Sequence, residues 1–70
     1  MESLFIEMYK EVFDTEGNVK NCGRVVCQQL ITLANSLGKK LGESLDFGNA
    51  KTGFVNVENM RKLYMMVQKG

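Results

Sequence analysis

The chain has 70 residues, enough for one small domain, and its 44% hydrophobic and 24% charged residues exclude intrinsic disorder. Its formal net charge of +1 is far below that of a typical basic nucleic-acid-binding domain. No apolar run reaches the length of a transmembrane helix, and the first residues do not resemble a signal segment. We therefore expect a cytoplasmic protein, located in the host cytoplasm if a phage or virus encodes it.

A domain this small usually needs a disulfide, a metal ion or a partner chain to be stable. With no histidine and two cysteines, the chain cannot build a structural zinc site alone. Cys22 and Cys27 are five residues apart, a spacing that turns their side chains away from each other on one helix. We therefore expect reduced, buried thiols, and self-association or a protein partner as the remaining source of stability.

The first helix is expected over residues 3–14, with Ser3 as its N-cap. Its apolar positions follow the helical period and cover a broad surface: Leu4, Phe5, Ile6, Met8, Tyr9, Val12 and Phe13. Residues 14–18 then predict a turn in which Gly17 adopts the left-handed conformation. These residues also resemble the start of an EF-hand loop. Valine stands at positions 19 and 25, however, where calcium binding requires glycine and glutamate, so the turn is the preferred interpretation.

The second helix is expected over residues 19–38, because apolar side chains recur there every three or four residues. This stripe consists of Val19, Cys22, Val26, Leu30, Leu33 and Leu37. Its middle members, Val26, Leu30 and Leu33, are predicted to form the centre of the core. A narrower face of small residues lies beside the stripe: Gly23, Cys27, Ala34 and Gly38. Since small residues allow another backbone to approach closely, we predict a dimer seam along this face, with Gly38 also ending the helix.

Residues 42–56 form the long glycine-rich loop expected between the second and third helices. A loop of this length in a small domain is functional, flexible or contains a short element of its own. Phe47 and Phe54 are expected to anchor it to the core, and residues 54–57 are the candidate for a short extended piece.

The third helix is expected over residues 57–68. Residues 63–67 (LYMMV) are all apolar or aromatic, which is more apolar surface than one helix can bury against two others. The excess predicts a contact surface for a partner that includes Tyr64 and Met65.

Residues 21–26 (NCGRVV) resemble the NWGRVV signature of the first homology region of Bcl-2-like proteins, with Cys22 in place of the tryptophan. In that family the glycine admits a ligand helix and the arginine pairs with an aspartate of the ligand. The match covers six residues and does not assign the family. It selects Gly23 and Arg24 as an exposed pair of a small residue and a cation at the start of a helix.

We predict a protein without enzymatic activity, cofactor or metal ion. The commonest general base, histidine, is missing, and no glycine-rich phosphate-binding motif is present. Glu7 and Glu11 lie one turn apart and are interpreted as acids on a solvated helix face. The cysteines have no activating neighbour beyond Arg24.

Charge is unevenly distributed: residues 1–16 contain five acids and one lysine, whereas the remainder is basic. The two parts can attract each other within one chain or between chains. An alternative function is binding of nucleic acid through the basic residues Lys39, Lys40, Arg61 and Lys62. A third is binding of a small anion between subunits at Lys39, Lys40 and Lys51.

The sequence thus predicts an all-α, three-helix domain that assembles as a helical oligomer. The expected function is a small regulatory, inhibitor or adaptor protein, of phage or viral origin as judged from size alone, that acts by binding a protein partner and by self-association. The candidate binding residues are Gly23, Arg24, Cys27, Ala34, Lys39, Lys40, Tyr64 and Met65.

Overall fold

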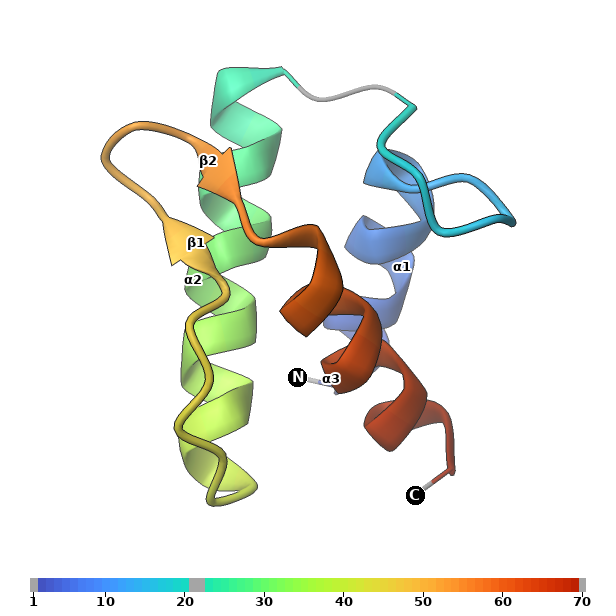
Figure 1. Cartoon of the computed structure of the whole chain (residues 1–70), viewed down its shortest axis with the longest axis vertical. Coiled ribbons are helices and arrows are strands. Elements are labelled where there is room, and N and C mark those ends of the chain that lie inside the picture. The colour runs from blue at the N-terminus through green and yellow to red at the C-terminus, as the bar shows by residue number, and fades with distance from the viewer. Residues whose placement is uncertain (1, 21–22, 70) are drawn as a thin grey trace.

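The computed structural model describes residues 2–20 and 23–69 of the chain. Its elements are α1 (Glu2–Val12), α2 (Arg24–Lys40), β1 (Gly48–Asn49), β2 (Phe54–Val55) and α3 (Val57–Lys69) (Figure 1). The prediction of a predominantly helical chain with three helices is confirmed, and a small two-stranded sheet is added to it. None of the helices described is long and apolar enough to cross a membrane.

Helix α1 buries one face through Phe5, Tyr9 and Val12, which are spaced by four and three residues. The turn that follows it is closed by Asp14, whose Oδ1 accepts hydrogen bonds from the backbone N–H groups of Glu16 and Asn18, both at 2.9 Å. Gly17 adopts φ +83°, as predicted for this turn. The chain then runs back beside the end of α1 through a β-bridge between Phe13 and Val19.

Helix α2 begins at Arg24, five residues later than its apolar period predicted. Val19, the expected first residue, lies instead in the β-bridge and is 43% exposed. The buried face of α2 consists of Cys27, Leu30, Ile31, Ala34, Leu37 and Gly38. The expected core centre is correct for Leu30, but Val26 and Leu33 are only partly buried.

Three members of the predicted small-residue face, Cys27, Ala34 and Gly38, are buried within the chain itself, whereas Gly23 is exposed. Ala34 is fully buried and Cys27 is 1% exposed, so neither can contact a second molecule in this fold. Gly38 lies within α2, and a Cβ at this position would come within 2.7 Å of the ring of Phe47. The prediction of a dimer seam along this face is therefore wrong. At Gly38, the close approach is made by the chain's own Phe47.

The predicted loop contains a β-hairpin in which β1 and β2 pair antiparallel, with Gly48 opposite Val55 and Asn49 opposite Phe54. Both strands contact α2 (Figure 1). Phe47, just before the hairpin, is 1% exposed and anchors the segment as expected, whereas Phe54 is 63% exposed and does not. Helix α3 completes the core with Met60, Leu63 and Val67. The hairpin thus fixes the segment before β1, which borders α3.

Candidate functional site

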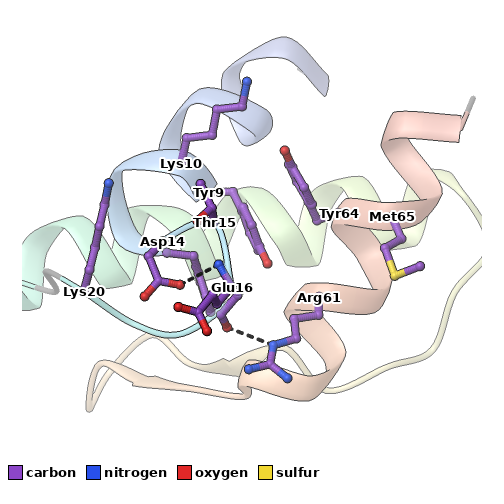
Figure 2. Close-up of a pocket in the computed structure, with 11 residues that line it drawn as sticks. Tyr9, Lys10, Asp14, Thr15, Glu16, Lys20, Arg61, Tyr64 and Met65 are labelled. Atoms are coloured by element: carbon purple, nitrogen blue, oxygen red, sulfur yellow. Dashed lines mark hydrogen bonds between the residues drawn. The ribbon is translucent and has the colours of Figure 1, made fainter.

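A hollow of about 460 Å³ lies between α1, α3 and the turn at residues 14–17 (Figure 2). Its base is a stack of three aromatic rings. Tyr9 stacks on Phe13 with ring centres 4.4 Å apart and on Tyr64 with ring centres 3.9 Å apart, and the ring planes are nearly parallel. Figure 2 shows the two tyrosines face to face with their hydroxyls at opposite ends. Aromatic pairs of this kind stabilise by about 0.5–1.5 kcal/mol beyond area burial, so the stack fixes α3 against α1.

Arg61 closes one side of this hollow by binding the turn after α1. Its Nε donates to the carbonyl oxygen of Gly17 at 2.8 Å (Figure 2). Its terminal nitrogen donates to Oδ1 of Asn18 at 3.1 Å. The amino groups of Lys10 and Lys20 point away from Arg61 in this view. The cations around the hollow therefore do not converge on a common point where they could bind an anion.

Burial raises the pKa of Tyr9 above its ordinary value, and the nearby guanidinium of Arg61 opposes this rise. A raised folded-state pKa means that folding favours the neutral phenol. The contribution of the neutral Tyr9 phenol to the free energy of unfolding is fully present below about pH 10. It is lost as the pH rises through the folded-state pKa of Tyr9. We expect the free energy of unfolding to fall with pH in this alkaline range, and to fall less steeply in Tyr9→Phe. Urea unfolding at several pH values checks this expectation, and identical pH dependence in both proteins would contradict it.

A second hollow, of about 420 Å³, lies between α3 and the segment before β1. Its apolar lining residues are Leu45, Met65 and Met66, and its charged lining residues are Glu43 and Lys62. Met65 lines both hollows and is 58% exposed, and Met66 is 36% exposed. We call Leu45, Tyr64, Met65 and Met66 together the α3 face. Its members on α3, Tyr64, Met65 and Met66, are the part of the predicted 63–67 surface that stays accessible, since Leu63 and Val67 are buried.

Three of the four cations of the predicted nucleic-acid surface have a partner or an acidic neighbour in the chain. Arg61 is bound to the Gly17 turn, whereas Lys39 lines a different hollow together with Glu43. Lys62 lies 3.8 Å from the carboxylate of Glu58 in an exposed ion pair. The carboxylate of Glu43, which borders both the Lys39 and the Lys62 hollows, opposes binding of phosphate there.

Within one chain, the lysines of the anion site predicted between subunits lie apart. The carbonyl oxygen of Lys51 accepts a hydrogen bond of 3.2 Å from the Arg24 side chain, which places Lys51 near the first residue of α2. Lys39 and Lys40 are the last two residues of that helix. About 24 Å of helix separates them from Arg24, at 1.5 Å per residue. Lys51 therefore cannot share a ligand with Lys39 and Lys40 of the same chain.

Gly23 is the exposed N-cap of α2, and Arg24 is exposed beside it, as the sequence predicted. The Arg24 guanidinium is already directed to the hairpin of its own chain. Val25 is 65% exposed, and Phe54, which follows the hairpin turn, is 63% exposed. Neither is predicted from the sequence as an exposed apolar residue: Phe54 is expected to anchor the loop to the core, and Val25 is assigned to no surface.

The prediction that the cysteine thiols are reduced is wrong for Cys27. No described cysteine is free, and Cys27 is disulfide-bonded. The prediction of a reduced thiol assumed that both cysteines lie on one helix, but α2 begins at Arg24, after position 22. Cys22 itself lies outside the described residues. Among residues 2–20 and 23–69, no group of three or more histidine, cysteine or acidic residues is arranged to hold a metal ion.

Comparison with known proteins gave no matching family model, no significantly similar curated protein and no significantly similar solved structure.

Proposed function

We propose that the protein is a non-catalytic binding module that assembles through the α3 face. The observation that carries this proposal is the position of Met65, a largely exposed apolar side chain between two hollows. Removing apolar surface from water stabilises a contact by about 25 cal/mol per Å². The flexible thioether of methionine also adapts well to the shape of a partner. The α3 face therefore has the chemistry of a protein contact.

A small regulatory, inhibitor or adaptor protein is the class that this surface supports best, because such proteins act by contact alone. The absence of histidine from the sequence favours the same class over an enzyme. Disulfides persist mainly in oxidising environments, so the disulfide at Cys27 favours such a compartment over the cytoplasm.

Met65→Glu is expected to dissociate the assembly, because a carboxylate forced into an apolar contact must lose its water without gaining a partner. The helix itself should be unaffected, since position 65 is exposed and Arg61 and Lys62 lie one turn earlier. Sedimentation equilibrium measures the dissociation constant, which we expect to rise at least about tenfold.

Val25→Glu is the matched control. Val25 is similarly exposed and lies on a helix, but it is remote from the α3 face in sequence and lines neither of its hollows. This variant should assemble like the unmodified chain. Equal dissociation by both substitutions would contradict a specific role for the α3 face.

A further inference from the structure

The hollow between α3 and the segment before β1 has one charged residue on each of its two walls. Lys62 lies on α3, and Glu43 lies on the segment between α2 and β1. The apolar lining also comes from both walls, with Met65 and Met66 on α3 and Leu45 on the segment. The surface therefore combines accessible apolar side chains with one cation and one anion.

Both charges are available to a second molecule. Within residues 2–20 and 23–69, Glu43 forms no ion pair, and its backbone N–H is bound to the carbonyl oxygen of Gly38 at 2.8 Å. Lys62 lies 3.8 Å from Glu58, but their side chains are 57% and 81% exposed. An ion pair this exposed contributes little to stability. Lys62 can therefore approach a carboxylate of another chain at little cost.

A surface with these features is complementary to a copy of itself. A two-fold axis that runs along the hollow places the α3 wall of one copy opposite the segment wall of the other. Lys62 of each copy then faces Glu43 of the other, so the pair forms twice. A strongly basic or acidic partner would instead repel one of the two charges. The balanced charges thus favour a second copy over such a partner.

We propose that two copies of this protein bind each other through their α3 faces as a symmetric dimer, in which Lys62 of each copy pairs with Glu43 of the other. This inference rests on the proposed function and names the partner of the α3 face. Burial of Met65 and Met66 stabilises the contact, and the two ion pairs fix its orientation. Because each copy uses its α3 face for the other, the assembly is closed at two chains.

Reversal of one charge at a time tests this pairing. In a dimer of the Glu43→Lys variant, two lysines face each other at both symmetric positions. In a dimer of Lys62→Glu, two glutamates do so. The dissociation constant of each variant in sedimentation equilibrium should therefore rise at least about tenfold. Neither side chain is buried, so circular dichroism should show an unchanged fold.

Mixing the two variants in equal amounts should restore the dimer. In a dimer with one chain of each, the unchanged Lys62 faces the unchanged Glu43, and the introduced lysine faces the introduced glutamate. Both pairs are then attractive again. The mass should approach that of two chains at a concentration where each variant alone stays near the mass of one.

Two further variants control for net charge. The double variant Glu43→Lys/Lys62→Glu has the net charge of the unmodified chain and carries its two charges on exchanged walls. It should dimerise with a dissociation constant within about threefold of that of the unmodified chain. Glu7→Lys changes the net charge as Glu43→Lys does, at an exposed position of α1 outside this hollow. It should dimerise like the unmodified chain.

Added salt tests the pairing without any substitution. Since opposite charges meet in the contact, the dissociation constant of the unmodified chain should rise severalfold as screening increases between low salt and about 0.5 M. A dissociation constant that does not change with salt would overturn the ion pairs.

The outcomes separate this inference from the function on which it rests. An unmodified chain that never associates overturns both. If Met65→Glu abolishes association but neither the mixture nor the double variant restores it to the weakened charge variants, the α3 face remains the contact and the symmetric pairing is overturned. Charge variants that associate normally lead to the same conclusion. A mass above that of two chains overturns the closed dimer.

Discussion

Leu30→Ala is expected to lower the free energy of unfolding by about 2–5 kcal/mol, the range for leucine truncation in a rigid core. Leu30 is fully buried in α2, in the same core cluster as residues from α1 and α3. Its removal leaves a cavity that the surrounding helices cannot fill without moving. A domain of this size has roughly 4–10 kcal/mol of stability in total. The melting temperature should therefore fall by at least about 8 °C.

Leu41→Ala provides the control, because it is the same truncation at the end of the same helix. Leu41 is the C-cap residue of α2 and is 42% exposed, so little buried surface is lost. We expect a loss below about 1 kcal/mol. Urea unfolding of both variants gives the comparison, and equal losses would show that Leu30 is not at the centre of the core.

Gly48→Ala is the second substitution with a large expected effect. Gly48 adopts φ +133°, a conformation that side chains other than glycine rarely take. A Cβ at this position would collide with the carbonyl oxygen of Phe54 and lie 3.1 Å from the Cα of Val55. Both are backbone atoms of the paired strand and cannot rotate away. The backbone conformation alone should cost about 1–3 kcal/mol, and the collision adds to that cost.

Gly42→Ala separates the two contributions. Gly42 also has a positive φ, +79°, but a Cβ there would meet no atom within 4 Å. The Gly42→Ala variant should be destabilised only by the cost of a positive φ for alanine. Its loss of stability should therefore be smaller than that of Gly48→Ala. Equal stability of the two variants in urea unfolding would mean that the close approach of β2 to Gly48 is absent. Since the hairpin fixes the segment that contains Leu45, Gly48→Ala should also weaken assembly.

The three helices could be predicted from the sequence, because each places apolar residues at the helical period. The start of α2 could not. Val19 continues that period, yet its pairing with Phe13 keeps it outside the helix. The orientation of α2 was also misjudged. Its apolar residues cover a broad arc, and Phe47 arrives from a segment distant in sequence to pack against Gly38. A periodicity read along one helix contains no information about that contact.

Only part of the candidate site could be predicted from the sequence, because its other residues also depend on contacts between segments distant in sequence. Tyr64 and Met65 were identified from an apolar excess, which a helix in a small domain must leave exposed somewhere. Cys27 and Ala34 were misplaced, because a small residue permits a close approach without specifying whether the approaching group belongs to the same chain. Leu45 lies in a segment whose packing depends on the whole fold. Its contribution to a surface is visible only from the structure.

Sedimentation equilibrium of the unmodified chain over a wide range of concentrations tests self-assembly most directly. We predict a weight-average mass that rises with concentration, because the exposed Met65 and Met66 of the α3 face are removed from water in the contact between copies. A folded protein whose mass stays near 7.9 kDa at every concentration would contradict the account.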